Sequence, residues 1–179
     1  MLDFDLTTEQ KTLVEETKRF TREKIIPVAG EADKKHEFPM DVFKEAWELG
    51  FVGPTIPEEY GGAGMTEVDN VLLTEELAFG CTGIQTSMTA NTLAATPILI
   101  AGNDEQKKKY LGLLTSEPVF ASYAITESAA GSDAAGIQTR VRKDGNDYII
   151  NGEKIYITNG AWARWYVVFA TVDPALRHK

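Results

Sequence analysis

Apolar residues recur at the spacing of one helical face up to about residue 115, and this pattern predicts a succession of helices. The first expected helix begins at Thr7, because Thr7 and Gln10 have the spacing of a capping box. It is expected to end where Pro27 removes a backbone donor. Further helices are expected over residues 39–49, 66–79, 80–102 and 105–114, the last of them capped by Asn103 or Asp104.

Proline and glycine interrupt this pattern between the second and third expected helices. Pro54, Pro57 and the glycine-rich residues 61–64 indicate a turn-rich connection. A P-loop is excluded because the glycines are not followed by lysine and then serine or threonine. We therefore interpret this segment as a linker.

After Pro118 the period changes from helical to alternating, which predicts an antiparallel sheet. Asp144-Gly145 and Asn151-Gly152 are the dipeptides typical of hairpin turns. The expected strands are residues 119–126, 139–143, 148–150, 154–158 and 165–172. The predicted fold class is α+β, with an N-terminal helical domain over residues 1–117 followed by the beginning of an antiparallel β domain over residues 118–179.

Composition and charge exclude several classes of function. The net charge of -9 would repel a phosphate backbone, so nucleic acid is not expected as a partner. Cys81 is the only cysteine, and His36 and His178 are too few for a histidine-rich metal site. Residues 80–102 carry no charge but too many polar side chains for lipid, so no membrane contact is expected. The start of the chain has neither an apolar signal core nor an arginine-rich presequence, and no targeting segment is expected.

Two short segments carry most of the candidate chemistry. Residues 123–133 read YAITESAAGSD, and residues 155–160 read IYITNG. Each ends a strand-like run in small, hydroxyl-bearing and glycine residues, so backbone N–H groups and threonine hydroxyls can close on a flat, polar-edged, phosphorylated ligand. The alternative is that Thr126 and Thr158 are strand residues present for their β propensity.

These segments resemble the acyl-CoA dehydrogenases, and most closely their medium-chain branch. The resemblance runs from Phe4 to about Asp173 and includes AWELG at 46–50, EELA at 75–78 and IAGNDEQKKKYLG at 100–112. It implies FAD as cofactor, a fatty acyl-CoA as substrate and a trans-2-enoyl-CoA as product, in fatty acid β-oxidation. It also implies electron transfer flavoprotein as electron acceptor and a homotetramer in the full-length protein. The implied location is the mitochondrial matrix of a eukaryote or the cytoplasm of a bacterium.

The resemblance also assigns roles to residues of both segments. Thr158 is expected to hydrogen-bond near flavin N5, where a fixed hydroxyl can stabilise charge on the ring, and Thr126 at the pyrimidine edge. Tyr156 is expected against the flavin, where the family often has tryptophan. The implied cofactor set is Tyr123, Ala124, Ile125, Thr126, Gly131, Ser132, Tyr156, Ile157 and Thr158. The implied substrate set is Ser132 with Gln85, Thr86, Thr89 and Ala90, the last four lining an acyl cavity.

The chain departs from the family pattern after the Thr126-Glu127 pair. Ser128 and Ala129 stand where the family has a proline and often a glycine. The loss of the proline is expected to loosen the loop, and alanine is less permissive at positive φ than glycine, so weaker cofactor binding is expected. Asp133 is expected to order this loop rather than to take part in catalysis. No metal site is expected.

The reaction implied by the resemblance needs a carboxylate base in apolar surroundings. In the family this glutamate belongs to the C-terminal helical domain, so its position is expected beyond Lys179, and no residue of 1–179 matches it. Glu75 and Glu76 are interpreted as a solvated helix face. The 179-residue chain is therefore expected to be an inactive fragment without the C-terminal domain. Two alternatives remain, a binding module for acyl-CoA or a partner without redox activity, and a relative of the acyl-CoA oxidases.

Overall fold

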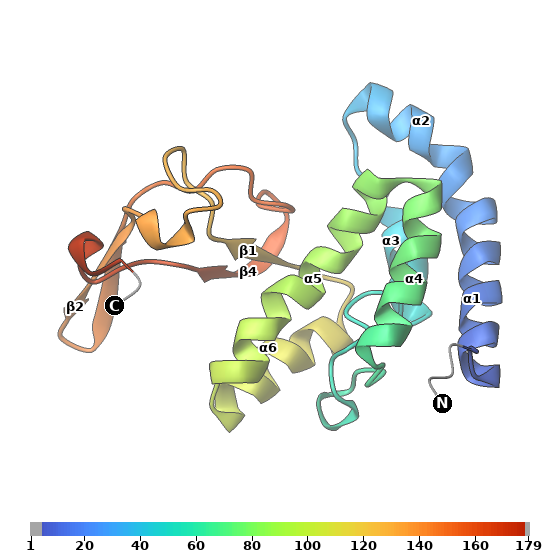
Figure 1. The fold of residues 1–179 in the computed structure, drawn as a ribbon, viewed down its shortest axis with the longest axis horizontal. Coiled ribbons are helices and arrows are strands. Elements are labelled where there is room, and N and C mark those ends of the chain that lie inside the picture. Colours follow the sequence, from blue (N-terminus) through green and yellow to red (C-terminus); the bar gives the residue numbers. More distant parts are fainter. Residues whose placement is uncertain (1–4, 178–179) are drawn as a thin grey trace.

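The computed structural model describes residues 5–177, which form a helical part followed by a smaller part built of strands and loops (Figure 1). His178 and Lys179 lie outside the described residues, and so does the catalytic base that the resemblance implies beyond Lys179. The helices are α1 (Thr8–Phe20), α2 (Ile26–Lys35), α3 (Met40–Glu48), α4 (Glu67–Gly80), α5 (Thr82–Ala101) and α6 (Asp104–Ser116). The strands are β1 (Phe120–Ala124), β2 (Arg140–Asp144), β3 (Asp147–Asn151) and β4 (Ala163–Val168), with short 3-10 turns at Glu58–Tyr60, Ala134–Gly136 and Pro174–Leu176.

Capping boxes begin three of these helices. Thr7 with Gln10, Thr66 with Asp69, and Asn103 with Gln106 each exchange side-chain and backbone hydrogen bonds at the first turn of α1, α4 and α6. These bonds satisfy amide groups that otherwise have no partner inside a helix. The expected starts of the first and third helices are thereby confirmed, and Asn103 rather than Asp104 is the cap of α6.

Pro27 does not end the first helix, contrary to the sequence prediction. The chain passes from α1 through one π-helical turn, Thr21–Ile25, directly into α2, and Pro27 lies in the first turn of α2. A wider turn shifts the hydrogen-bond pattern by one residue, and a first-turn position does not need the amide donor that proline lacks. The hydroxyl of Thr21 donates to the carbonyl oxygen of Glu76 at 3.0 Å and joins this turn to α4.

The strands pair in two separate ribbons. Strands β2 and β3 form the expected antiparallel hairpin around Gly145, which has a φ of +61°. Strands β1 and β4 pair in parallel, unlike the antiparallel pairing expected for this sheet. The long connection between them carries the hairpin outward and returns the chain in its original direction, which an antiparallel neighbour would not require.

Residues 154–158 are not a strand, and Asn151-Gly152 is not a hairpin turn, so both sequence predictions are wrong. Tyr156 and Asn159 have φ values of +55° and +61°, which break an extended conformation. Gly152 instead allows the side chain of Thr139 to lie close to the backbone, because a Cβ atom at Gly152 would lie 2.3 Å from the Thr139 hydroxyl oxygen. The segment crosses beside the end of β1 without forming a ladder.

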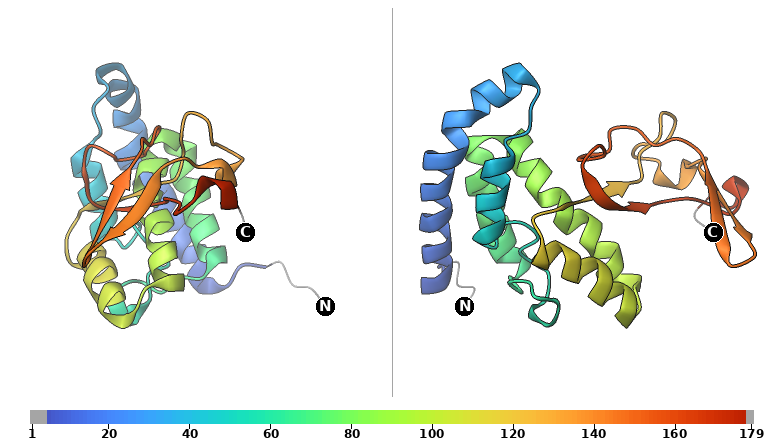
Figure 2. Two further views of the ribbon diagram at one scale, coloured as in Figure 1. Left: turned by 90° about the vertical axis from the view of Figure 1, so that its left-hand side faces the viewer. Right: turned by 180° about the vertical axis from the view of Figure 1, so that it is seen from behind.

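The helical core extends into the strand part through β1 and β4. Phe120 of β1 lies against Phe43 of α3 with ring centroids 4.0 Å apart. Trp165 of β4 is buried near Tyr110 of α6, with centroids 5.4 Å apart. Figure 2 shows α5 and α6 on the side of the helical part that faces these strands. Large aromatic contacts of this kind fix the orientation of the strands on the helices.

None of the described helices is long and apolar enough to cross a lipid bilayer. Helix α5 has the length, but its threonines, Gln85 and Asn91 lower its mean hydropathy.

Candidate functional site

A cavity of about 440 Å³ lies between helix α5, the end of strand β1 and the segment that follows Ile155. Residues far apart in the sequence meet here, and most of them belong to the sets expected from the sequence. The lining side chains are Thr86, Thr89, Ala90 and Leu93 of α5, Tyr123, Ile125 and Thr126 at the end of β1, and Tyr156 and Thr158. The expected substrate wall and the expected cofactor wall are therefore two sides of one cavity.

Asn91 sets the distance between these two walls. Its buried side chain donates from Nδ2 to the carbonyl oxygen of Val119 at 2.9 Å and accepts from the amide of Ala121 at 2.8 Å. Both bonds join α5 to the backbone at the start of β1. Buried polar groups of this kind are costly to leave unpaired. Sequence reasoning did not single out Asn91, because a single asparagine in an uncharged helix gives no sign of its partner.

The segment around Thr158 is attached to both walls. The amide of Ile155 donates to the carbonyl oxygen of Thr126 at 3.0 Å, and the Ser122 hydroxyl donates to the carbonyl oxygen of Thr158 at 2.8 Å. Asn159 Nδ2 donates to the carbonyl oxygen of Ser87 on α5 at 2.7 Å. The segment is thus held in an irregular conformation by three long-range bonds.

Tyr156 is presented to the cavity rather than packed into the protein. Its φ of +55° is uncommon for a bulky residue, and its side chain is 90% exposed. Residues in such conformations persist where the surrounding structure holds them, and they concentrate at binding sites. An exposed aromatic ring on the wall of a cavity offers a flat surface on which a planar ligand can stack.

The threonine hydroxyls of the strand wall and of the α5 wall differ in whether they already form hydrogen bonds within the protein. Within the described part of the chain, the hydroxyls of Thr126 and Thr158 form no hydrogen bond with protein groups. On α5, by contrast, Thr89 accepts from Gln85 Nε2 at 3.0 Å and donates back to the helix backbone, and Thr86 donates to Gln85 Oε1 at 3.3 Å. The strand wall therefore offers free donors to a ligand, whereas the α5 wall offers mostly methyl and methylene surface.

Some expected site residues do not line the cavity. Gln85 and Ala124 are buried beneath its walls, and Ile157 is half-buried in the segment between Tyr156 and Thr158. Gly131 and Ser132 are exposed on the loop after β1, outside the cavity lining. Gln85 still affects the α5 wall indirectly, because its side-chain amide donates a hydrogen bond to the hydroxyl of Thr89.

The loop after Thr126 begins with a tight turn. The amide of Glu127 donates to the carbonyl oxygen of Ala130 at 3.0 Å, and the amide of Ala130 donates back to Glu127 at 3.1 Å. Ala129 is not among the residues with positive φ, so glycine is not required at its position. Farther along, Arg177 Nη2 pairs with Asp133 at 2.5 Å and joins the loop to the turn that follows β4.

A buried ion pair lies directly behind the cavity. Lys154 Nζ donates to Glu127 Oε1 at 2.7 Å and to the carbonyl oxygen of Ile125 at 2.9 Å. The amides of Gln138 and Thr139 donate to the same carboxylate at 2.6 and 2.9 Å. Burial alone would raise the pKa of Glu127, but the hydrogen bonds from Lys154 and the two amides lower it to about 2.

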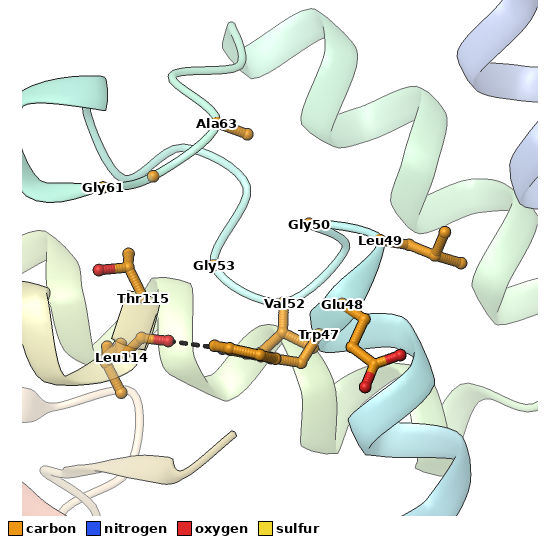
Figure 3. Close-up of a pocket in the computed structure, with 11 residues that line it drawn as sticks. Trp47, Glu48, Leu49, Gly50, Val52, Gly53, Gly61, Ala63, Leu114 and Thr115 are labelled. Atoms are coloured by element: carbon orange, nitrogen blue, oxygen red, sulfur yellow. Dashed lines mark hydrogen bonds between the residues drawn. The ribbon is translucent and has the colours of Figure 1, made fainter. Parts of the chain in front are cut away.

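A second cavity of about 390 Å³ lies away from these residues, between α3, the glycine-rich linker and the end of α6 (Figure 3). Trp47 Nε1 donates to the carbonyl oxygen of Leu114 at 2.8 Å along its wall. None of the expected site residues lines it. The linker is therefore a packed turn region that supports α3 and α6.

Comparison with known proteins places the chain in one family. Residues 7–118 match the family model for the acyl-CoA dehydrogenase N-terminal domain, and residues 122–179 match the model for the middle domain. A probable medium-chain specific acyl-CoA dehydrogenase 2, mitochondrial, from Caenorhabditis briggsae is 47% identical over 97% of this chain and 42% of its own length. The chain thus spans less than half the length of this relative.

Solved structures give the same assignment. A glutaryl-coenzyme A dehydrogenase in complex with glutaryl-CoA superposes with a TM-score of 0.92 at 34% identity, over 98% of this chain and 46% of that one. An acyl-CoA dehydrogenase from Bacillus anthracis in complex with FAD superposes with a TM-score of 0.87 at 37% identity, over 97% and 30% of the two chains. The chain belongs to the acyl-CoA dehydrogenase family of oxidoreductases.

Proposed function

We propose that this chain forms the N-terminal domain, residues 1–117, and the first part of the middle domain, residues 118–179, of an FAD-dependent dehydrogenase that converts a medium-chain fatty acyl-CoA to a trans-2-enoyl-CoA. The observation that carries the proposal is the shared cavity in which helix α5 faces Thr126, Tyr156 and Thr158. One wall has the free donors that a flavin edge needs, and the other has the apolar surface that a fatty tail needs.

The residues at the cavity fit a flavin ring. Thr126 and Thr158 present hydroxyls without protein partners in the described chain, and Tyr156 presents an exposed ring beside them. Tyr123, Ile125 and Ile157 complete the proposed contact surface, with Ala124 buried behind it. When bound, FAD supplies a hydride acceptor, and the role of the threonines is to orient its ring and to stabilise charge through fixed hydroxyls.

The acyl chain is proposed to lie along α5. The side chain of Gln85 forms hydrogen bonds with the hydroxyls of Thr86 and Thr89. The cavity side of α5 therefore presents few free polar groups to a fatty tail. Ala90 is a small residue in the lining of the cavity. We propose a tail of medium length because the matching worm relative is named as medium-chain specific. Gly131 and Ser132, on the exposed loop, are proposed to contact phosphate or the CoA part of the substrate.

We also propose that the 179-residue chain does not catalyse the reaction by itself. Abstraction of a proton next to a thioester needs a carboxylate base in apolar surroundings. Within the described residues no aspartate or glutamate lines the cavity, and Glu127 behind it is ionised and paired with Lys154. The base is therefore proposed to come from a domain that follows Lys179 in the whole enzyme. The chain would then bind FAD without turnover of acyl-CoA.

The proposed cellular role follows from the family. We place the whole enzyme in fatty acid β-oxidation as a homotetramer that passes electrons to electron transfer flavoprotein. The matching worm relative is named as mitochondrial, which supports the mitochondrial matrix for a eukaryotic source. For a bacterial source the proposed location is the cytoplasm.

Two measurements on the purified chain test the proposal. Titration of FAD, followed by flavin fluorescence, is expected to show saturable binding, and octanoyl-CoA with an artificial electron acceptor is expected to show no turnover. Turnover would refute the inactive state of the chain. Saturable binding of octanoyl-CoA without any binding of FAD would instead favour a binding module, and rapid oxygen consumption by the loaded full-length protein would favour an oxidase.

A further inference from the structure

The buried pair of Glu127 and Lys154 connects the two segments that form the strand wall of the cavity. Glu127 directly follows Thr126, and Lys154 lies two residues before Tyr156. The side chains are 7% and 9% exposed, and neither residue lines the cavity itself. The pair therefore acts on a ligand only through its neighbours.

The geometry of the pair gives more than a charge contact. Lys154 bonds both to the carboxylate and to the carbonyl oxygen of Ile125, so the end of β1 is held at two points. The carboxylate also accepts the amides of Gln138 and Thr139, which begin the outward hairpin. Three stretches of chain that are distant in sequence are thus joined by directional hydrogen bonds at one buried point.

An apolar pair would fill the same space but would not select one arrangement of these segments. Buried ion pairs contribute little net stability compared with apolar packing, whereas their directional bonds can specify a single arrangement. The segment after Lys154 needs such specification, since it has no ladder and contains Tyr156 and Asn159 at positive φ. The backbone bond from the amide of Ile155 to the carbonyl oxygen of Thr126 joins the two segments of the strand wall, and it persists only while the segment after Lys154 stays in place.

We propose that Glu127 and Lys154 are positioning residues that hold the two segments of the strand wall, the end of β1 with Thr126 and the segment Tyr156–Thr158, at a fixed separation for the flavin ring. This inference rests on the proposed function for the identity of the ligand, but the positioning itself can be measured without it. Loss of the pair releases the segment after Lys154 while the helical part keeps its fold.

The test compares Lys154→Met, Lys154→Arg and the control Lys143→Met in the 179-residue chain. Lys143 lies on the exposed hairpin and forms no ion pair within residues 5–177. Lys143→Met is therefore the same substitution at a position that is neither buried nor paired. In Lys154→Met, exchange of the Ile155 amide hydrogen with solvent is expected to become at least about tenfold faster, while the amides of α5 keep their protection. Lys154→Arg retains the charge and the donors but is bulkier, so its Ile155 amide is expected to exchange more slowly than that of Lys154→Met. Lys143→Met is expected to exchange as the parent chain does.

FAD titration of the same proteins gives the second readout. Lys154→Met is expected to bind FAD about tenfold more weakly, because a small displacement of one wall misaligns the donors of the site. Unchanged exchange at Ile155 in Lys154→Met would overturn the proposal, and so would loss of protection throughout α5, which would make the pair a requirement for folding. If the parent chain binds no FAD but Ile155 responds as expected, the positioning stands and the proposed function fails.

Discussion

Asn159 donates from its side-chain amide to the main-chain carbonyl oxygen of Ser87 at 2.7 Å, across 72 positions of sequence. This bond joins the segment that carries Thr158 directly to helix α5, so the two walls of the cavity are connected at its rim as well as through Asn91. The backbone of Asn159 has a φ of +61°, a conformation that asparagine tolerates better than most residues. Asn159 thus both adopts the positive φ that the turn requires and forms the hydrogen bond to α5.

The first prediction concerns this contact. Asn159→Asp keeps the size of the residue and its tolerance of positive φ, but it replaces the donor with a carboxylate that faces a carbonyl oxygen. FAD affinity is expected to fall by about tenfold, which corresponds to the loss of roughly one hydrogen bond. Flavin fluorescence titration measures the change. Asn151→Asp on the exposed end of β3 is the matched control, and equal affinities in the two variants would contradict the role of the contact.

The free hydroxyls on the strand wall give the second prediction. Thr126→Val and Thr158→Val keep the shape of the side chain, and neither hydroxyl has a partner in the described chain. The free energy of unfolding is therefore expected to change by less than about 0.5 kcal/mol. The dissociation constant for FAD is expected to rise about tenfold for each variant, because each removes one hydrogen bond to the ligand.

The control for these variants is Thr96→Val, on the exposed side of α5, whose hydroxyl donates to the carbonyl oxygen of Thr92 at 2.9 Å. It removes a threonine hydroxyl that lies outside the cavity. Urea unfolding and flavin titration separate stability from binding. If Thr126→Val and Thr158→Val bind FAD as tightly as Thr96→Val does, the threonines are strand residues without a role in the cofactor site.

Ser128 is the position of the third prediction. It is the second residue of the turn from Glu127 to Ala130, where proline is favoured because its ring presets the required φ. Ser128→Pro is expected to stabilise the chain by about 0.4–1 kcal/mol, because the unfolded chain loses freedom. It is also expected to tighten FAD binding, because a more rigid loop loses less freedom when the ligand binds. Ala129→Pro, at the disfavoured third position, is expected to destabilise it. Thermal unfolding of both variants decides, and a lower melting temperature for Ser128→Pro would show that the loop does not gain from proline.

The fourth prediction tests the connection between α5 and β1. Asn91→Leu fills similar space but leaves the carbonyl oxygen of Val119 and the amide of Ala121 without their buried partner. The free energy of unfolding is expected to fall by roughly 2–4 kcal/mol, the cost of leaving two buried polar groups unpaired. Urea unfolding measures it, with Asn146→Leu in the exposed hairpin turn as control. A loss similar to that of the control would mean that water replaces the missing bonds.

Local rules predicted the starts of α1, α4 and α6, because the signals for these ends are local, but they did not predict α2. The capping boxes at Thr7, Thr66 and Asn103 each involve residues three positions apart, and the sequence shows them directly. The pairing of β1 with β4 could not be predicted in the same way, since alternation of apolar residues marks a strand but not the direction of its partner. Pro27 does not end the helical segment, because a π-helical turn precedes it and Pro27 lies in the first turn of α2, where its missing amide donor is not needed.

For the candidate site, the sequence identified the surfaces but not the bonds that arrange them. Thr126, Thr158 and Tyr156 were identified from hydroxyl-rich segment ends and from the resemblance, and the structure brings them to one cavity with Thr89. The contacts that hold these residues are long-range bonds between side chains and backbone, such as those of Asn91 and Asn159. The pairing of Glu127 with Lys154 was not foreseen, because charged residues 27 positions apart read in sequence as exposed loop residues.

The last prediction follows from the ionisation of Glu127. Its pKa is lowered from 4.5 to about 2 in the folded chain, although burial opposes the shift, because Lys154 and two amides donate to the carboxylate. A lowered pKa means that the contribution to stability is fully present above about pH 4.5 and is lost as the pH falls toward about 2. The free energy of unfolding is therefore expected to fall by roughly 2 kcal/mol between about pH 5 and pH 3 through this group.

Urea unfolding over that range, compared with Glu127→Gln, isolates the effect. Glutamine cannot release a proton, so the variant is expected to be less stable than the parent near neutral pH and to lose less stability on acidification. Asp69, whose pKa is lowered by hydrogen bonds from Thr66 and Gln10, contributes an acid-dependent loss to both proteins and cancels in the difference. Parallel stability curves for the two proteins would mean that the carboxylate of Glu127 has the same pKa folded and unfolded, and the buried pair would then hold no charge-dependent part of the stability.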